Sequence, residues 1–481
     1  MENKIDLNKQ EIELVPISIV NDIGILFTWK NHLFRAIKSS SAKDVQELFD
    51  CGLIKELSDN KLFPDSWVSE YMLDGFEFIV EHNKINNVSY PYEWTFSMLK
   101  DAAKAVLDVN IISKKYGYET KDCHSFNIVY DGTIPKFVDL GSFISIEPGS
   151  KTWKAYEQYL KSYYYPLRIW GIGNSFIARS IITNESEFIS HSEYLLFKFS
   201  GLRILPIKII TKVTKKYFKY KNISLKSYDD LRKNLPQPFA SIVWFLKEKG
   251  LLPNISICFD SLKEKLEKVN SKKTNSRWGN YHNEFYDENN VIKTTPRIDR
   301  IIEIISKMKV KSVVELGGNQ GVVSKLLLNS FNFLERAACT DYDEDAVESM
   351  YLSSKKSNLM DLSPVLLNFI LPVSISKGKP AYERFKSDIV IALAITHHLL
   401  LSQQLRIDVI LHEISNYSTR YVMIEFMPLG LWDGNNSATV PHWYTIDWFR
   451  SSFQDYFNIV SEEKLECNRV LFVGEKRFEH K

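Results

Sequence analysis

A carboxylate followed by closely spaced glycines is the most chemically informative stretch of the chain. It consists of Glu315, Gly317, Gly318 and Gly321. The residues from 312 to 316 are mostly apolar and β-branched, and the apolar residues from 322 to 328 have the spacing of a helix. This order predicts a buried strand, a tight turn and a helix N-terminus, where an α/β sheet binds a nucleotide-like ligand.

The spacing favours S-adenosylmethionine (SAM) over NAD as that ligand. A dinucleotide site needs Gly-x-Gly-x-x-Gly so that pyrophosphate can lie on the helix N-terminus, whereas here an acid precedes the first glycine. Glu315 would repel phosphate but could hold the ammonium of a methionine moiety. Asp341 ends the next apolar stretch and suits a carboxylate that bonds two ribose hydroxyls. The alternative is an ordinary glycine turn in an α/β domain, and the second acid argues against it.

Polar side chains accompany the later apolar stretches as well. Asp361 and Leu362 come where SAM enzymes commonly place a carboxylate and a hydrophobic neighbour against adenine. His397 and His398 follow one fully apolar stretch, and Glu425 follows the next. A histidine there could be the general base for a hydroxyl, because its pKa lies near neutrality, and Glu425 could orient it or bind substrate. The alternative is that one or both histidines only pack or orient a loop.

These side chains need a sheet that brings its strand ends to one edge. Strand-like apolar runs alternate with helical patterns from about residue 295 onward, at 312–316, 337–341, 388–394, 421–424, 457–460 and 469–474. The alternation predicts a doubly wound, Rossmann-like α/β sheet with its ligand beyond the strand carboxyl ends. We therefore assign 297–481 to a methyltransferase domain. Residues 268–296 are predicted to be a linker and cofactor-covering segment, in which Tyr281 either closes the SAM pocket or simply packs.

Residues 1–150 carry a second set of polar residues. Asp122 is followed by Asn127, a predicted hairpin and Asp139-Leu-Gly. This order resembles the catalytic and metal-binding loops of protein kinases and aminoglycoside phosphotransferases. By that resemblance Asp122 would orient an acceptor hydroxyl, and Asn127 and Asp139 would hold magnesium on ATP phosphates.

The resemblance to kinases is incomplete. The first 60 residues contain only Gly24 and Gly52, so a Gly-rich loop is missing, and Lys38 is only a loose candidate for the usual strand lysine. We therefore expect residues 1–150 to form a degenerate kinase-like α+β domain, with Mg-ATP as a cofactor only if the region is active. Chance similarity is the remaining alternative.

Residues 151–267 are predicted to be a mainly helical extension. Within 206–220, Lys208, Lys212, Lys215 and Lys219 share one helical face, with apolar residues roughly opposite. A basic amphipathic helix can lie on an anionic membrane surface. The alternative is a solvated lysine face over a buried apolar one.

Composition narrows the class of protein. Lys and Arg together number 61 against 59 Asp and Glu, so a nucleic-acid partner receives no support from net charge. The five cysteines lie far apart, without metal-ligand spacing, and predict reduced thiols and no metal site. No apolar run reaches the length of a membrane span. We expect a cytoplasmic protein, at most peripheral at the inner membrane face.

The order of motifs over nearly the whole chain resembles a family of two-part bacterial proteins that includes the NoeA-type nodulation methyltransferases. The matching stretches are Tyr90-Pro-Tyr-Glu-Trp94, Leu99–Ala103, Lys121-Asp122 with Asn127, Val138–Ser142, Trp153–Tyr156, Trp278 with Tyr281, Glu315-Leu-Gly, Ala394 with His397-His398-Leu, and Glu425-Phe-Met-Pro. Gly318 departs from the family, where a cysteine is common, and the residues after Pro428 depart from its lysine-acid pattern. The resemblance implies SAM-dependent methylation of a surface or secreted glycan, at a sugar hydroxyl.

Two other functions remain open from the sequence. One is a bifunctional enzyme that phosphorylates and methylates a glycan terminus, and the other is a non-enzymatic SAM-fold adaptor. The intact glycine turn with its acids argues against the adaptor. The acceptor is a saccharide by resemblance, with small molecules and proteins as alternatives, and no residue pattern indicates an oligomeric state.

Overall fold

The computed structural model describes residues 5–15, 22–150, 152–183, 189–198, 239, 242, 257–272, 276, 278–279, 283–286, 292–373, 378–432 and 439–477. The chain divides into two compact units. Unit 1 comprises Met1–Lys84, Met98–Val129 and Pro135–Lys273, and unit 2 comprises Ile85–Ser97, Tyr130–Ile134 and Thr274–Lys481. The predicted basic helix at 206–220 lies outside the described residues.

Unit 1 is an α+β structure. Its elements include β1 (Ile5–Asp6), β2 (Glu13–Leu14), β3 (Gly24–Trp29), β4 (His32–Ile37), α1 (Ser39–Asp50), α2 (Leu53–Asp59), β5 (Ser66–Val68), β6 (Tyr71–Met72), β7 (Phe78–His82), α3 (Phe96–Lys115), β8 (Tyr118–Thr120), η3 (Ser125–Asn127), β9 (Ile128–Asp131), β10 (Ile134–Phe137), η4 (Leu140–Ser142), β11 (Phe143–Ser145), α4 (Tyr156–Tyr159), η5 (Leu160–Tyr164), α5 (Tyr165–Gly171), α6 (Ser175–Thr183), α7 (His191–Lys198) and α11 (Phe259–Glu267). The main sheet has the strand order β2-β3-β4-β7-β5, and its described pairings are all antiparallel.

The predicted boundary at residue 150 falls inside unit 1. Lys104 on α3 forms an ion pair of 2.7 Å with Glu267 on α11, and the rings of Trp153 and Phe259 lie 5.1 Å apart. The ion pair joins the described part of the predicted helical extension to α3, and the ring contact lies within the extension. The extension therefore belongs to the same compact unit as most of the first 150 residues.

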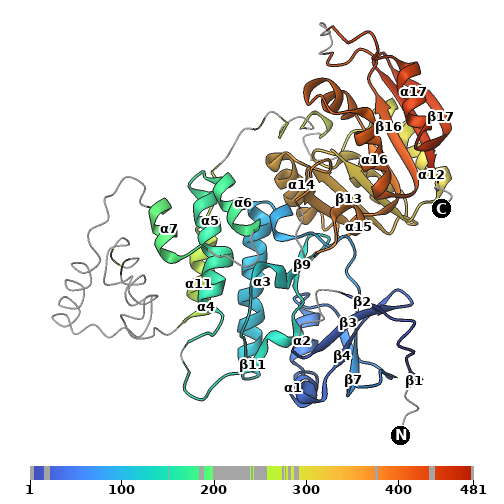
Figure 1. Ribbon diagram of the computed structural model, residues 1–481. Coiled ribbons are helices and arrows are strands. Elements are labelled where there is room, and N and C mark those ends of the chain that lie inside the picture. The colour runs from blue at the N-terminus through green and yellow to red at the C-terminus, as the bar shows by residue number, and fades with distance from the viewer. Residues whose placement is uncertain are drawn as a thin grey trace. The chain divides into compact units, whose positions relative to one another are not determined.

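Unit 2 is built on a larger α/β sheet (Figure 1). Its elements are η2 (Pro91–Glu93), η6 (Asn283–Phe285), α12 (Pro296–Met308), β12 (Ser312–Leu316), α13 (Val322–Ser330), β13 (Arg336–Asp341), α14 (Glu344–Lys356), β14 (Leu362–Leu366), α15 (Ala381–Arg384), β15 (Ser387–Ala392), η7 (His398–Ser402), α16 (Ile407–Tyr417), β16 (Ser418–Phe426), α17 (Ile446–Gln454), β17 (Phe457–Glu466) and β18 (Arg469–Lys476). The strand order is β14-β13-β12-β15-β16-β18-β17. The first five strands of that order are parallel to one another, and β18 is antiparallel to both β16 and β17.

Helices cover both faces of this sheet. Apolar residues of α12, α13 and α14 form one core cluster with the strands, and those of α16 and α17 form a second. β12 is buried along its whole length, as a central parallel strand covered on both faces must be. The doubly wound α/β fold predicted for the C-terminal part is confirmed. The chain leaves β12 first toward β13 and later returns to β15 on the other side, so the switch point lies at β12.

Two short segments from the first third of the chain belong to unit 2. Glu93, in η2, is almost fully buried and pairs with Arg384 of α15, whose side chain is also buried. The ring of Tyr130 contacts both Trp94 and Tyr351, with centroids 5.2 and 6.0 Å away. The predicted methyltransferase domain, 297–481, is therefore only part of the compact unit.

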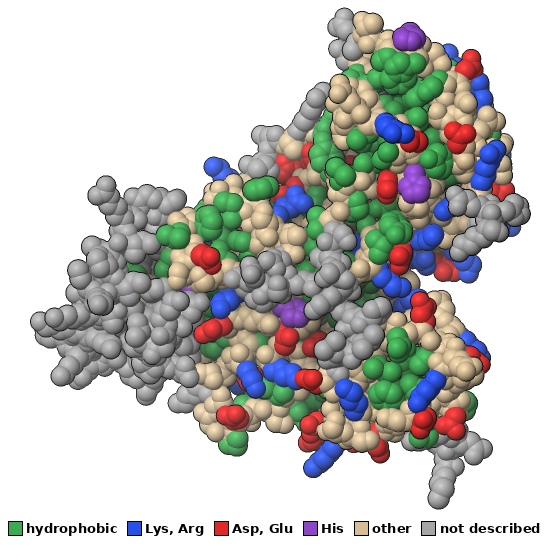
Figure 2. All heavy atoms as spheres, viewed as in Figure 1, with side chains coloured by type: hydrophobic (Ala, Val, Ile, Leu, Met, Phe, Trp, Pro, Cys, Tyr) green, Lys and Arg blue, Asp and Glu red, His purple; other side chains and the backbone are tan. Residues whose placement is uncertain are grey.

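Charges of both signs are distributed over the surface. On the face shown in Figure 2, blue and red side chains are interspersed among the described residues, as the near-balance of 61 basic and 59 acidic residues leads one to expect. Among the described helices, none is both long enough and apolar enough to cross a membrane.

Candidate functional site

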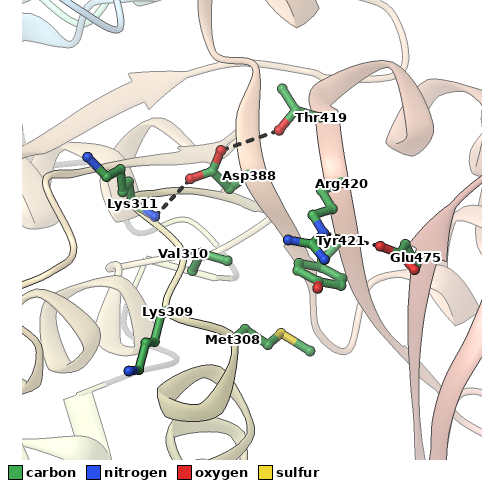
Figure 3. Close-up of a pocket in the computed structure, with 9 residues that line it drawn as sticks. All are labelled: Met308, Lys309, Val310, Lys311, Asp388, Thr419, Arg420, Tyr421 and Glu475. Atoms are coloured by element: carbon green, nitrogen blue, oxygen red, sulfur yellow. Dashed lines mark hydrogen bonds and ion pairs between the residues drawn. The ribbon is translucent and has the colours of Figure 1, made fainter.

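A surface hollow occurs at the amino-terminal edge of the large sheet. It is lined by Met308, Lys309, Val310, Lys311, Asp388, Thr419, Arg420, Tyr421 and Glu475 (Figure 3). The carboxylate of Asp388 accepts hydrogen bonds from the Lys311 backbone N–H at 2.8 Å and the Thr419 hydroxyl at 3.4 Å. Doubly wound sheets bind ligands at the opposite, carboxyl edge, so this hollow is not the candidate site.

The glycine turn lies at the switch point, directly after β12. Gly321 has φ = 70° and is the N-cap of α13, a left-handed conformation that favours glycine. A side chain on Gly318 would overlap Cys339 Sγ on β13. The turn is therefore pressed against β13.

Glu315 stabilises this turn through hydrogen bonds with Ser324. Its side chain is buried, and Oε2 accepts a hydrogen bond of 3.0 Å from the backbone N–H of Ser324 and another from the Ser324 hydroxyl. Burial raises the pKa of Glu315, and the hydrogen bonds from Ser324 act against that rise. The carboxylate thus ties the first turn of α13 to β12, whereas the sequence predicted that it holds an ammonium directly.

Asp341 ends β13 beside the same turn. Its Oδ2 accepts a hydrogen bond of 2.8 Å from the Asn319 backbone N–H, and its Oδ1 accepts one of 2.9 Å from the Asp343 N–H. Burial raises the pKa of Asp341 to about 6, although the backbone N–H groups favour the ionised form. The predicted position of this acid, at a strand end next to the glycine turn, is what the structure shows.

A segment preceding α12 contacts both loops. The Asn319 side chain donates to the Trp278 carbonyl at 2.9 Å, and the Gln320 side chain donates to the Gly279 carbonyl at 2.8 Å. The Ser276 hydroxyl donates to Asp343 at 2.8 Å. The described part of the predicted covering segment therefore lies against the glycine turn and the loop after β13. Tyr281 lies outside the described residues.

The assignment of Asp361 and Leu362 to the adenine site needs correction. Leu362 begins β14 and pairs with Ala337 near the start of β13, so both residues lie at the amino-terminal end of β14. Leu362 is fully buried in the core. The carboxyl end of β14 is instead followed by Leu367 and Asn368, and the Leu367 N–H donates to the Asp341 carbonyl at 2.8 Å. Exposed Asn368 is thus the polar side chain at the correct edge.

His397 and His398 follow the carboxyl end of β15, with ring centroids 4.1 Å apart. His397 is 6% exposed, and its Nδ1 has no hydrogen-bond partner within the described part of the structure. Burial, followed by the nearby His398 and Arg469, lowers the pKa of His397 to about 3. His398 is half-buried, and its ring contacts that of Trp278 at 5.2 Å. A neutral His397 with so low a pKa would accept a proton poorly.

Glu425 is engaged in a buried ion-pair network. Arg297, at the start of α12, donates to both carboxylate oxygens at 2.6 and 2.8 Å, and Arg469 of β18 donates at 3.0 Å. The Glu425 side chain is fully buried. The sequence predicts that Glu425 orients a histidine or binds substrate, whereas within the described part of the chain its side chain accepts hydrogen bonds from these two arginines. Its contribution to the site is to hold α12 and β18 at the end of β16.

A second hollow lies among residues that follow the carboxyl ends of β15 and β16. It has a volume of about 550 Å³ and is lined mainly by Leu400, Leu401, Leu405, Pro441, Trp443 and Trp448, with Arg406 and Asp408 at hand. The two tryptophan rings meet edge to face at 4.7 Å, and Trp443 is 41% exposed. An apolar, aromatic wall with a few polar groups is typical of small-ligand sites.

The three residues assigned to a kinase-like site lie in unit 1. Asn127 donates from its side chain to Asp139 at 3.5 Å, and Asp139 also accepts from the Gly141 N–H and the Ser142 hydroxyl at 3.1 and 2.6 Å. Asp122 accepts from the His124 backbone N–H at 3.2 Å. Within the described ranges, no group of three or more His, Cys, Asp or Glu side chains could hold a metal ion by itself.

Comparison with known proteins gives one related sequence. No family model matches the chain. Nodulation protein NoeA of Rhizobium meliloti (strain 1021) is 23% identical over 433 residues, which cover 84% of this chain and 83% of that protein. The chain is a distant homologue of NoeA. The predicted resemblance to NoeA is confirmed, and the kinase-like region stays a prediction.

Solved structures resemble part of the chain. PH0226 protein from Pyrococcus horikoshii OT3 is 18% identical with a TM-score of 0.32, covering 41% of this chain and 98% of that one. N-methyltransferase NodS from Bradyrhizobium japonicum WM9 is 8% identical with a TM-score of 0.29, covering 38% and 98%. A SAM-dependent methyltransferase from Aquifex aeolicus is 12% identical with a TM-score of 0.28, covering 38% and 100%.

Proposed function

We propose that the chain is a class I SAM-dependent methyltransferase. The observation that carries the proposal is the joint placement of the glycine turn and Asp341 at the switch point of a doubly wound sheet. A nucleoside bound there would lie at the start of α13, beside a carboxylate at the neighbouring strand end. Glu315, the acid before the first glycine, would repel the pyrophosphate of a dinucleotide. A nucleoside with a cationic tail, such as SAM, is the nucleotide-like ligand that avoids this repulsion.

The described residues fit such a ligand. Asn319 Oδ1 is buried without a hydrogen-bond partner among them, which is costly unless a ligand or water supplies a donor. Asp341 would accept the ribose hydroxyls, and Asn368 would present its amide to the base. When bound, SAM supplies a methyl group on a sulfonium, so the protein's main task is to position the acceptor in line with it.

The acceptor in this proposal is a hydroxyl of a surface saccharide or glycolipid intermediate. The distant homologue NoeA is named as a nodulation protein, and the resemblance to the NoeA-type family is the basis for choosing a saccharide as the acceptor. His398 would accept the proton of that hydroxyl. The hollow at Trp443 and Trp448 begins only a few residues beyond His398, at Leu400, and offers an apolar wall on which a sugar ring could lie.

Replacing Asp341 with alanine is expected to weaken binding of S-adenosylhomocysteine. Two charge-assisted hydrogen bonds to the ribose disappear, which costs roughly 2–4 kcal/mol, or at least about tenfold in affinity. Calorimetric titration of the full chain measures this directly. Asp361→Ala is the matched control, because that acid lies at the opposite edge of the sheet and its loss should leave affinity unchanged.

Two outcomes would contradict the proposal. One is a folded wild-type chain that does not bind S-adenosylhomocysteine at millimolar concentration. The other is an Asp341→Ala variant that binds as tightly as the wild type. Because Asp341 also accepts backbone hydrogen bonds, the melting temperature of each variant should be recorded beside its affinity.

Binding of S-adenosylhomocysteine is also expected to depend on pH. Only the ionised Asp341 can accept both ribose hydroxyls, and burial raises the pKa of this group to about 6. Affinity should be constant above about pH 7 and fall by up to about tenfold per pH unit below pH 6. The effect on stability has the opposite sign: because the folded pKa exceeds the unfolded one, this group's contribution is present at low pH and lost as pH rises through about 6. A flat affinity profile between pH 5 and 8 would contradict the assignment of Asp341.

A further inference from the structure

Trp278 contacts both the glycine turn and the candidate base of unit 2. Its backbone carbonyl accepts the hydrogen bond of 2.9 Å from the side chain of Asn319. Its indole ring lies edge to face against the imidazole of His398, with ring centroids 5.2 Å apart and an angle of 71° between the rings. One residue thus combines a hydrogen bond from the cofactor side of the site with a ring contact on the acceptor side.

The backbone around Trp278 is held in place by further hydrogen bonds. The Gln320 side chain donates to the Gly279 carbonyl at 2.8 Å, and the Gly279 N–H donates to the Ser276 hydroxyl at 2.8 Å. Asn319 and Gln320, the two donors from the glycine turn, are only 7% and 5% exposed. Hydrogen bonds are stronger in such a buried setting than in water, so the turn fixes the position from which the indole projects.

Asn319 connects Trp278 to the carboxylate that we assign to the ribose. Its backbone N–H donates to Asp341 Oδ2 at 2.8 Å, and its own φ is 52°. Few side chains adopt this left-handed conformation, which persists where the surroundings determine it. The Oδ1 atom of Asn319 has no hydrogen-bond partner among the described residues. A ligand group that donates to Oδ1 would therefore act on the same amide that holds the Trp278 carbonyl.

The backbone of His398 is also packed toward the glycine turn. Its N–H donates to the Ile395 carbonyl at 3.1 Å, and a side chain on Gly317 would overlap the Ile395 side chain. His398 begins η7, a single turn of π-helix, and such turns are frequent at functional sites. With the backbone placed in this way, the contact with Trp278 bears on the direction of the imidazole. That direction matters because a general base must lie within hydrogen-bond reach of the proton it takes.

We propose that Trp278 is a positioning residue that sets the orientation of the His398 imidazole, and that the hydrogen bond from Asn319 makes this orientation depend on the occupied cofactor site. This role rests on the SAM site and the base proposed above, and it adds a coupling between them. Binding of the cofactor at the turn should change the surroundings of His398 through Trp278, so that the base takes its working orientation only beside a bound cofactor.

The test follows the NMR signal of the His398 ring while the full chain is titrated with S-adenosylhomocysteine. The chain contains ten histidines, so they are labelled with ¹³C at Cε1 and the signal is identified with His398→Gln. Saturating ligand should move this signal in the wild type. In Trp278→Leu most of that shift should be lost, because the ring contact is gone. Affinity measured by calorimetry should stay within about threefold of the wild type, because the carbonyl that Asn319 bonds is retained.

Three further variants accompany this measurement. Trp278→Phe keeps an aromatic ring and should retain most of the shift. Asn319→Gly keeps the left-handed backbone, which suits glycine, but deletes the hydrogen bond to Trp278, and it should lose the shift at saturation. Trp67→Leu replaces a tryptophan on β5 of unit 1 that is 43% exposed. It is the matched control and should give the wild-type response.

Calorimetry and NMR together separate the possible failures. A wild-type chain that binds S-adenosylhomocysteine without any shift of the His398 signal would overturn the coupling and leave the cofactor assignment intact. A shift as large in Trp278→Leu as in the wild type would also overturn it. Failure of the folded wild type to bind the ligand would contradict the proposed function itself, and the coupling with it. If Trp278→Leu does not fold, Asn319→Gly replaces it, with the same loss of shift expected.

Discussion

Replacing His398 with alanine is expected to slow methyl transfer by roughly 10²–10⁴-fold, the usual contribution of a general base. Affinity for S-adenosylhomocysteine should change little, because the base acts on the acceptor. His398 follows the carboxyl end of β15, is partly accessible, and lies against Trp278 of the segment that contacts the glycine turn. Single-turnover rates with a saccharide acceptor, measured across pH, would check this prediction.

His397 provides the comparison for that experiment. Burial lowers its pKa to about 3, so it stays neutral across the working range and contributes no ionisation to the rate profile. His397→Ala should reduce stability through the cavity it leaves and keep the pH dependence of the rate. If His397→Ala removed that pH dependence and His398→Ala did not, the roles of the two histidines would have to be exchanged.

Replacing Glu425 with alanine is expected to destabilise the protein by about 3–5 kcal/mol. The carboxylate is fully buried and bonded by Arg297 and Arg469, so its removal leaves two guanidinium groups without their counter-charge. Unfolding in urea, followed by fluorescence, would show the loss as a lower midpoint.

The chain contains a matched control for this prediction. Glu463 on β17 also receives two hydrogen bonds from an arginine of α12, from Arg300 at 2.8 and 2.9 Å, but these side chains are about a third exposed. Glu463→Ala should cost no more than about 1 kcal/mol, because water screens an exposed pair. Equal losses in the two variants would mean that burial does not set the strength of the Glu425 network.

The sequence predicts those parts of the site whose residues lie close together in the chain. The strand, turn and helix around Gly321 were predicted because glycine spacing and apolar periodicity are both local signals, and Asp341 followed from the end of the next apolar run. Asp361 was assigned from the usual place of the adenine acid in SAM enzymes, but the strand begins right after it, at Leu362, and Pro364 hides that strand because proline argues against one. In the structure Pro364 lies within β14, which is the edge strand of the sheet, where a missing donor is tolerated.

The sequence does not predict ion pairs between residues that lie far apart in the chain. Nothing near Glu425 points to Arg297 or Arg469, which are 128 and 44 positions away. The same holds for Arg35 of β4, a charged residue that is only 6% exposed. A charged residue in a strand-like stretch is ordinarily read as solvent-facing, and only tertiary packing reveals that it is enclosed.

The segments Ile85–Ser97 and Tyr130–Ile134, which belong to unit 2, have a consequence for biosynthesis. They leave the ribosome more than a hundred residues before β12, the first strand of the large sheet of unit 2. During that interval Glu93 lacks Arg384, and Tyr130, whose ring also contacts Trp94, lacks Tyr351. Unit 1 is interrupted by the same segments, so the two units cannot be separated by a single cut in the chain. Each unit therefore needs contacts between segments that lie far apart in the sequence. Forming contacts over such separations is slow, because the entropy of closing long loops must be paid first.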